Sequence, residues 1–275
     1  MDEELLNQTS AALRKAALNE EAKEYILSNP ILFNMLKKAA DRYIGGETLE
    51  ETINKVKFQN ERRLKCSIEF MGESTRTEND ANAARNEFIK ICQAIKHQGL
   101  NSTISLDLSH IGLAISQDLC LNNLNIICQE ALKGNIEVII SAENVDRTDA
   151  VLKTYKDIAR AYQNVGITLQ AYLYRTKEDF DEVIKFDGRI RIVKGAFETP
   201  SGLSLPRGEQ LDKVYLNYVD KLLNANHLCS IATHHEKIQQ EAKKLIQKYN
   251  VNSNINEFES LFGIQNEQLL VINKT

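Results

Sequence analysis

The sequence has no long apolar run and no dense cluster of basic residues. A membrane-spanning helix needs about 20 apolar residues in succession, and no stretch of the 275-residue chain approaches that length. The formal net charge of −4 gives no general attraction for nucleic acid or an anionic membrane. The first residues, MDEELLNQTS, are acidic and polar, whereas a signal peptide begins basic and continues apolar. We therefore expect a cytoplasmic protein with no membrane span and no nucleic-acid partner.

Cysteine is also scarce, and no two cysteines form a CxxC pair. The five are scattered and odd in number, which is not the pattern of a disulfide framework or a metal site. They are interpreted as small buried hydrophobic side chains. These residues are Cys66, Cys92, Cys120, Cys128 and Cys229.

Beyond residue 60, short apolar runs rich in β-branched residues alternate with longer amphipathic segments. A strand and a helix about every 30 residues are typical of parallel βαβ units. The G-x-G-x-x-G motif of a Rossmann sheet is absent, which favours an α/β barrel of the (β/α)8 TIM type over residues 61–275, without its last helix. The expected strands are residues 66–70, 102–108, 136–141, 167–174, 189–193 and 228–233, with weaker candidates at 254–260 and 268–273. The expected helices are residues 82–98, 117–133, 147–164, 178–186, 209–225 and 235–249.

In the first 60 residues the apolar side chains are spaced differently. Apolar residues between Asn7 and Lys57 recur near helical spacing, and Asn29-Pro30 ends one helix and starts the next. We therefore expect an N-terminal helical arm over residues 1–60, ahead of the barrel.

The fifth expected strand, RIRIVKGAFE, carries charged side chains and breaks at Gly195. Buried charge is costly unless an anion, a cofactor or water compensates it. Because the strand ends of such a barrel face its active site, Arg191 and Lys194 are expected at the mouth or inside the barrel. Cations at such a site suit phosphate or a cofactor that gains negative charge.

Polar residues also follow other expected strands. Each one alone is equally consistent with ordinary surface beyond a strand, but their convergence from several strands is typical of a barrel enzyme. They are Glu69, Glu73, Asp107, Ser109, His110, Ser141, Glu143, Gln170, Tyr172, Arg175, Thr233, His234 and His235.

Several segments resemble the proline dehydrogenases, which are FAD-dependent (β/α)8 flavoenzymes. The similarity runs from Arg42 to Ile264. It implies an oxidoreductase with FAD as cofactor that removes hydride from a carbon next to nitrogen. The segments that carry the resemblance are RYIGGETLEE, SIEFMGES, ITLQAYLYRT, RIVKGAF, IATHHEKI and EFESLFGI.

The resemblance also implies which residues hold FAD. Gln170 and Arg191 would contact the isoalloxazine, Arg191 near its reactive nitrogen. Further residues would continue the flavin cradle or touch the more distant part of FAD. These are Lys194, Gly195, Ala196, Thr233 and His234.

Three histidines near the sixth expected strand leave a minor second interpretation open. His227, His234 and His235 are residue types that ligate metals. Adjacent strand residues point to opposite faces, however, which disfavours a shared metal ion.

The sequence departs from the family pattern where the substrate would bind. Asp107 stands where the family has a lysine, Ser141 where it has an aspartate, and Phe197 where it has a tyrosine. With Tyr172, these residues are expected to line the substrate site. The family also continues into a helix with paired arginines, and this chain ends at Thr275 without that segment.

These departures predict that free L-proline is a poor substrate. Each lost charge-assisted hydrogen bond is worth about 1.5 to 3 kcal/mol. A proline-like or carrier-tethered amine is expected instead, with a partner chain or a homo-oligomer to complete the site. The alternative is an inactive flavin-binding or scaffold relative.

Asp107 is expected to share the catalytic role with Arg191. Its carboxylate would pair with a cationic amine and accept the amine proton before hydride leaves. The alternative is that Asp107 is turned away, or that it pairs with Lys194 in a structural ion pair.

Overall fold

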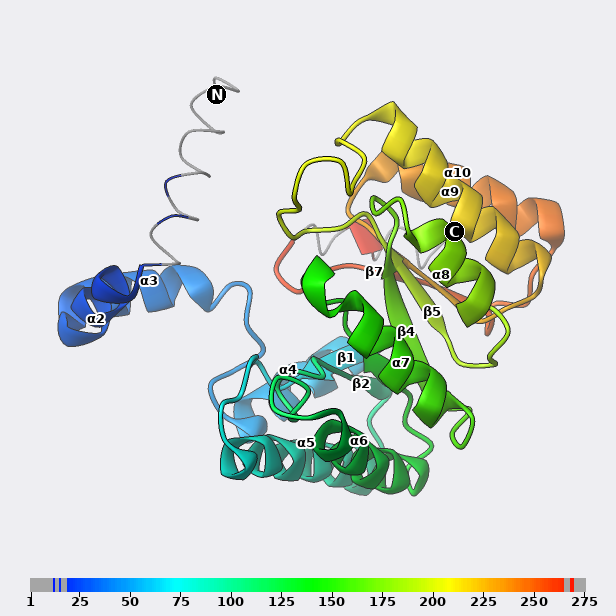
Figure 1. Ribbon diagram of the computed structural model, residues 1–275. Helices are drawn as coiled ribbons and strands as arrows, with labels where there is room; N and C mark the ends of the chain where they lie inside the picture. The colour runs from blue at the N-terminus through cyan, green and yellow to red at the C-terminus, as the bar shows by residue number, and fades with distance from the viewer. Residues whose placement is uncertain (1–11, 13–14, 16–18, 265–267, 270–275) are drawn as a thin grey trace.

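Parallel β-strands form one curled sheet at the centre of the molecule (Figure 1). The computed structural model describes residues 19–264 together with residues 12, 15, 268 and 269. Within this part, seven strands pair in chain order, each parallel to the next. They are β1 (Cys66–Glu69), β2 (Ser102–Leu106), β3 (Val138–Ile140), β4 (Val165–Gln170), β5 (Ile190–Val193), β6 (Cys229–Ala232) and β7 (Asn256–Glu259).

The two weaker strand candidates have different outcomes. The one expected at residues 254–260 is confirmed as β7. Of the one expected at residues 268–273, residues 270–273 lie outside the described part of the chain, and Gln268 and Leu269 are helical. The Gln268 side chain donates to Oε1 of Gln239 at 2.6 Å, so it lies against the last described helix.

The fourth strand is shorter than its apolar pattern predicts. The expectation of a strand over residues 167–174 is wrong at its C-terminal end, since β4 stops at Gln170. The chain turns there, because the Leu173 N–H donates to the Gln170 carbonyl at 3.3 Å. Of the residues that suggested a longer strand, Ala171, Tyr172 and Leu173 are buried in this turn, whereas Tyr174 is exposed.

Six helices follow the first six strands and cover the outside of the sheet (Figure 1). In α5, the Thr77 side chain accepts from the Asp80 N–H at the start, and Gly99 closes the end with φ of 61°, a conformation that favours glycine. No helix in the described part of the chain is long and apolar enough to cross a membrane. The six helices are α5 (Glu78–Gln98), α6 (Gln117–Leu132), α7 (Thr148–Ala159), α8 (Thr176–Val183), α9 (Glu209–Asn224) and α10 (Glu236–Tyr249).

The two faces of the sheet have different chemistry. Successive strand residues point to opposite faces. In β2, Ile104 and Leu106 are fully buried in the apolar core, while Ser105 points the other way. In β5, Ile192 belongs to the same core and Arg191 to the opposite face. The apolar core therefore lies outside the sheet, and polar groups line the barrel interior.

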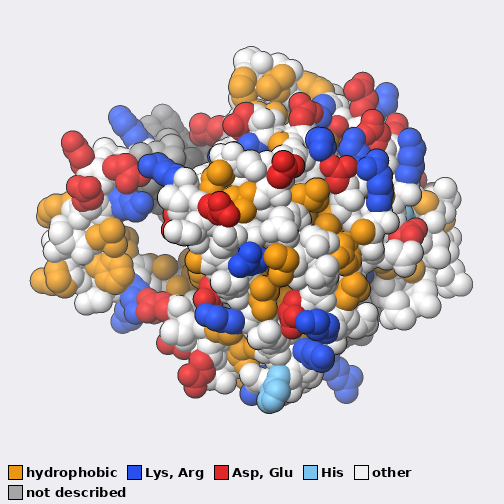
Figure 2. Space-filling view, turned by 60° about the horizontal axis from the view of Figure 1, so that its bottom comes forward, with side chains coloured by type: hydrophobic (Ala, Val, Ile, Leu, Met, Phe, Trp, Pro, Cys, Tyr) orange, Lys and Arg blue, Asp and Glu red, His pale blue; other side chains and the backbone are white. Residues whose placement is uncertain are grey.

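The N-terminal helices α2 (Glu20–Ser28) and α3 (Pro30–Ala40) stand away from the barrel (Figure 1). Asn29 separates them, as predicted, and its side chain accepts from the Leu32 N–H at 3.2 Å to cap α3. Neither helix has a buried residue. Figure 2 shows the apolar side chains gathered on this lobe, where the large exposed ones are Tyr25, Leu27, Ile31, Phe33, Met35 and Leu36.

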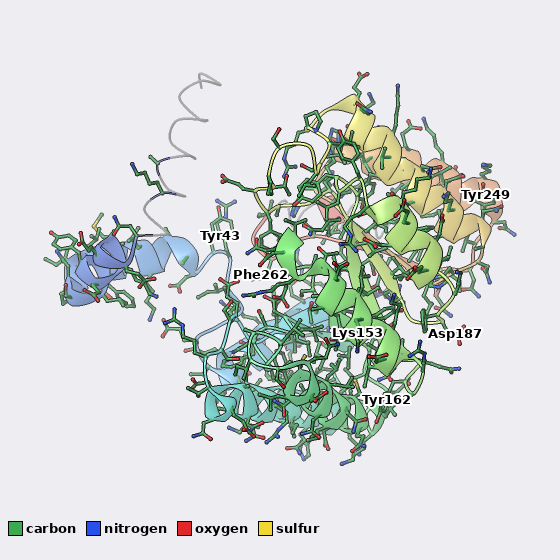
Figure 3. The ribbon with its side chains drawn as sticks, viewed as in Figure 1. Tyr43, Lys153, Tyr162, Asp187, Tyr249 and Phe262 are labelled. Carbon is green, nitrogen blue, oxygen red and sulfur yellow. The ribbon has the colours of Figure 1, made fainter. Side chains whose placement is uncertain are left out.

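A third N-terminal helix, α4 (Leu49–Glu61), belongs to the barrel body. It packs against β1 and buries Ile53 and Val56. The connection before it is fixed near the end of the sheet, because Nε of Arg42 donates to the Gly263 carbonyl at 3.3 Å. Figure 3 shows the neighbouring Tyr43 and Phe262 at this junction.

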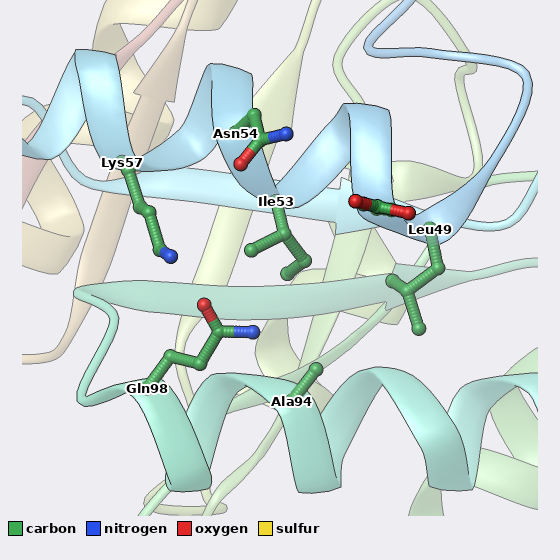
Figure 4. A pocket seen from close by; sticks show the side chains of 7 residues that line it. Leu49, Ile53, Asn54, Lys57, Ala94 and Gln98 are labelled. Atoms are coloured by element: carbon green, nitrogen blue, oxygen red, sulfur yellow. The ribbon is translucent and has the colours of Figure 1, made fainter.

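A groove lies on the outer surface between α4 and α5 (Figure 4). Its lining mixes apolar and polar side chains and includes none of the residues predicted for the site. The lining residues are Leu49, Glu50, Ile53, Asn54, Lys57, Ala94 and Gln98.

Candidate functional site

Two layers of charged side chains lie inside the barrel, one above the other. TIM-type barrels usually fill this space with branched apolar residues. Here β5 and the residue before it supply Arg189 and Arg191, and β7 supplies Glu257 and Glu259. Residues two apart on a strand share a face, so each pair contributes one member to each layer.

The lower layer sits at the N-terminal ends of the strands. Arg189 Nε lies 2.9 Å from Glu137 Oε1 and 3.4 Å from Glu257 Oε1. Lys65 contacts the same two carboxylates at 2.6 and 3.1 Å. Burial alone would raise the pKa of Glu257, but Arg189 and Lys65 outweigh it, and the net shift is downward. These ion pairs join β1, β3, β5 and β7 across the base of the barrel.

The upper layer is centred on Arg191, which is only 9% exposed. Its Nη1 donates to Ser105 Oγ at 3.1 Å and its Nη2 to Ser67 Oγ at 3.4 Å. Its Nε lies 2.7 Å from Oε2 of Glu259. Arg191 on β5 is thus held by β1, β2 and β7, as a fixed cation near the C-terminal mouth.

Asp107 lies just beyond β2, half-buried at the same mouth. Burial raises its pKa to about 7, with further increases from the negative charges of Glu69, Glu143 and Glu73, while a hydrogen bond with Ser141 acts in the opposite direction. A carboxyl with this pKa exchanges its proton readily near neutral pH, which suits a general base.

Serine hydroxyls connect Asp107 to Arg191. Ser141 lies beside the Asp107 side chain and lowers the pKa of its carboxyl, and Ser141 Oγ is 3.0 Å from Ser105 Oγ. Ser105 in turn accepts from Arg191. The structure therefore brings together Asp107, Ser141 and Arg191, which the sequence had placed on three different strands.

Gln170 ends β4 on the face that also carries Thr168. Its Nε2 donates to the Glu143 carbonyl at 3.2 Å, but its Oε1 is buried without a hydrogen-bond partner, as is the Thr168 hydroxyl. Thr168 is directly opposite Arg191 in the register of β4 and β5. An unsatisfied buried polar group costs about 1 to 3 kcal/mol. These two groups fit a planar cofactor with donors at its edge, held next to Arg191.

Lys194 contacts an acid other than Asp107. Its Nζ lies 2.6 Å from Oδ1 of Asp212 on α9 and 3.2 Å from Nδ1 of His235. The alternative of a structural ion pair between Asp107 and Lys194 is therefore wrong, because α9 packs beside β5 and supplies the acid.

Glycine is required at position 195. Its φ is 118°, and an added Cβ would lie 2.3 Å from the Tyr172 ring. The Tyr172 hydroxyl donates to the Phe197 carbonyl at 3.0 Å, which ties the turn after β4 to the loop after β5. Ala196 is exposed between them. Tyr172 is nearly buried, and Phe197 is half-buried.

Thr233 and His234 follow β6 and are fixed to the end of β7. The Thr233 N–H donates to the Glu259 carbonyl at 3.2 Å. His234 Nδ1 lies 3.0 Å from Ser260 Oγ, and burial lowers the pKa of His234. His227 lies before β6, with Nε2 at 2.7 Å from the Phe186 carbonyl. The three histidines thus occupy opposite ends of one strand, and no metal-binding cluster occurs among the described residues.

Some residues of the mouth were not predicted. Glu259 had no expected role, although the alternation in EFES on the seventh strand places it on the same face as Glu257. Glu143 was noted only as a polar strand end. It is buried, accepts from the Ser109 N–H at 2.9 Å and pairs with Arg147 at 3.0 Å. No local signal predicts Asp212 as the partner of Lys194.

Comparisons with known proteins identify relatives over most of the chain. A family described as proline dehydrogenase matches residues 51–271. Proline dehydrogenase 2 of Bacillus subtilis (strain 168) is 31% identical over 236 residues, which are 86% of this chain and 78% of that protein. Proline dehydrogenase 1 of the same strain is 30% identical over 229 residues, 83% of this chain and 76% of that protein.

Solved structures share the fold. The structure of proline utilization A (PutA) from Bdellovibrio bacteriovorus, inactivated by N-propargylglycine, matches with a TM-score of 0.81 at 17% sequence identity. The match covers 89% of this chain and 31% of that chain, so this chain spans less than a third of that protein. The likeness confirms the predicted TIM-type barrel.

Proposed function

This chain belongs to the proline dehydrogenase family, and from that premise we propose that it oxidises a carbon–nitrogen bond of proline or a proline-like secondary amine to the imine, with FAD as cofactor. Membership makes it an oxidoreductase related to enzymes named for acting on proline. The cofactor, the substrate and the residue roles that follow are our proposal.

The proposal rests on two groups of opposite charge at the C-terminal mouth of the barrel. Arg191 is a buried, fixed cation on one side, and the Asp107 carboxyl is joined to it through Ser105 and Ser141. A flavin gains negative charge on reduction, which a fixed cation stabilises without reorganisation. The amine carries positive charge before it is oxidised, which a carboxylate stabilises. The mouth therefore supplies one partner for each reactant.

The cofactor would lie over the ends of β4, β5 and β6. Gln170 and Arg191 would hold the flavin ring, since Gln170 Oε1 and the Thr168 hydroxyl are buried and lack partners. The flavin would supply the hydride acceptor. The remaining cofactor contacts would come from Lys194, Gly195, Ala196, Thr233 and His234.

The substrate amine would lie between the flavin and the residues after β2 and β3. In the proposal, Asp107 pairs with the ammonium form and takes its proton, and its pKa of about 7 fits this role near neutral pH. Ser141 holds the Asp107 carboxyl in place. Tyr172 and Phe197, which are tied together by a hydrogen bond, close the apolar side and exclude water.

Free L-proline is the first substrate to test. The expectations that it is excluded, or that the chain is inactive, receive no support from relatives that are named proline dehydrogenases. One observation does favour a neutral carboxyl derivative, because Glu69, Glu73 and Glu143 act electrostatically on Asp107 and would repel a carboxylate held beside it. L-prolinamide keeps the ring amine and lacks this charge.

The experiment is anaerobic bleaching of bound flavin by L-proline and by L-prolinamide. Wild-type protein should purify with flavin, or bind it on reconstitution, and at least one of the two amines should reduce it. Arg191→Met should weaken flavin retention or abolish bleaching, because the fixed cation is lost. Asp107→Asn should retain flavin and lose about tenfold or more in reduction rate. A chain that binds no flavin, or whose flavin no secondary amine reduces, contradicts the proposal.

A further inference from the structure

The upper charged layer of the barrel contains one acid whose role remains to be explained. Glu259 lies on β7, and its Oε2 is 2.7 Å from Arg191 Nε on β5. Strand β6 runs between them, with Ser230 opposite Arg191 and Ala232 opposite Glu259. Both intervening residues are small, so the carboxylate reaches the guanidinium across the strand.

The contact is an ion pair without a directed hydrogen bond. Arg191 Nε has no hydrogen-bond acceptor even though Oε2 is at contact distance, while both Nη groups donate to serine hydroxyls. Glu259 therefore acts on Arg191 mainly through its charge. Its own position is fixed by the strand, because the Glu259 carbonyl accepts the Thr233 N–H.

The two layers differ in how many charged groups share each contact. Arg189 contacts two carboxylates, Glu137 and Glu257. Arg191 contacts Glu259, and its hydrogen bonds go to uncharged Ser67 and Ser105. The lower layer thus balances two cations, Arg189 and Lys65, with two shared carboxylates. The upper arginine has one carboxylate at ion-pair distance, that of Glu259.

We propose that Glu259 is a positioning residue that sets the effective charge of Arg191, and thereby the reduction potential of the bound flavin. This inference rests on the proposed function. The Glu259 carboxylate disfavours the added negative charge of a reduced flavin, both directly and by offsetting the guanidinium. It holds the flavin potential lower than Arg191 alone would set it.

The test compares flavin midpoint potentials of wild type and Glu259→Gln by equilibration with a reference dye. The variant keeps the size of the side chain and removes its charge. We expect the reduction equilibrium to shift toward reduced flavin by about tenfold, which is about 30 mV for a two-electron couple. Glu259→Asp retains the charge and should return the potential most of the way to the wild-type value.

Glu257→Gln is the matched control, since it removes the carboxylate two residues earlier on the same strand and face. It breaks contacts to Arg189 and Lys65 at the base of the barrel. Both glutamine variants should lower the melting temperature of the apoprotein, but only Glu259→Gln should move the potential. Melting temperature alone therefore reports the structural contribution of each pair.

The possible results distinguish a failure of this inference from a failure of the proposed function. A wild-type chain that binds no flavin overturns both. If flavin is bound and its potential is unchanged in Glu259→Gln, or moves equally in Glu257→Gln, the inference is overturned while the proposed function stands. If Glu259→Asp shifts the potential as far as Glu259→Gln, charge is not the cause, and the inference is also overturned.

Discussion

At the scale of single residues, the chemistry of the mouth depends on partners contributed by other strands. Asp107 is an ordinary carboxyl in the sequence, and its pKa is raised to about 7 by burial and by acids on neighbouring strand ends. Arg191 is fixed by two serines and one glutamate from three other strands. The pKa of Asp107 and the position of Arg191 therefore depend on the residues around them and do not follow from the residue type alone.

Asp107→Asn should change how the stability of the apoprotein depends on pH. An aspartate in the unfolded chain titrates near pH 4, whereas the pKa of folded Asp107 is raised to about 7. The folded chain therefore binds this proton more tightly, and the stability it contributes is present below about pH 4 and lost as pH rises toward 7. Over that interval, the free energy of unfolding of the asparagine variant should rise relative to wild type by up to about 4 kcal/mol. Solvent screening reduces this gain, because Asp107 is only half-buried.

Urea unfolding of both proteins between pH 4 and 8 measures this difference. Ser141→Ala is the companion variant, because it removes the hydrogen bond that lowers the pKa of Asp107. It should extend the pH-dependent interval above pH 7. A stability difference between wild type and Asp107→Asn that is the same at pH 5 and pH 8 would show that the carboxyl titrates as it does in the unfolded chain.

At the scale of elements, the loops after β4 and β5 form one unit at the mouth. The Tyr172 N–H donates to the Lys194 carbonyl at 3.0 Å, and the Tyr172 hydroxyl donates to the Phe197 carbonyl. The Tyr172 ring packs against Gly195, where an added Cβ would not fit. The shape of this unit thus depends on one position without a side chain.

Gly195→Ala should destabilise the protein more than Gly202→Ala does. Both glycines have positive φ, 118° and 86°, but no atom lies within 4 Å of a Cβ built on Gly202. Gly202→Ala should therefore cost only backbone strain, roughly 1 to 2 kcal/mol. Gly195→Ala adds a clash with Tyr172 and should cost roughly 2 to 4 kcal/mol, with weaker flavin retention. Urea unfolding gives both values, and equal costs would mean that Tyr172 moves aside freely.

At the scale of the whole molecule, the barrel and the first two helices differ in how they are stabilised. The barrel has an apolar core outside the sheet and ion pairs within it. The helices α2 and α3 bury no residue, whereas α4 buries Ile53 and Val56. The stability of the barrel should therefore be independent of α2 and α3.

Deletion of residues 1–40 should change the melting temperature by less than about 3 °C. The described contacts it removes include the exposed pair of Lys37 with Glu47, and such surface pairs contribute about 1 kcal/mol or less. The control deletion, of residues 1–61, also removes Ile53 and Val56 from the core, which are worth about 1.5 to 3 kcal/mol each. Scanning calorimetry compares the two. Equal losses would show that α2 and α3 stabilise the barrel as much as α4 does.

The sequence by itself determined the alternation of strands and helices, the break at Asn29-Pro30, and the family, because these follow from local periodicity and short motifs. It also indicated that Arg191 enters the barrel, since strand residues alternate between faces. Only the tertiary structure decided that Glu259 contacts Arg191, that Lys194 pairs with Asp212, and that β4 ends at Gln170. These features depend on contacts between segments far apart in the chain, and local patterns do not record which distant side chain fills the space beside a charge.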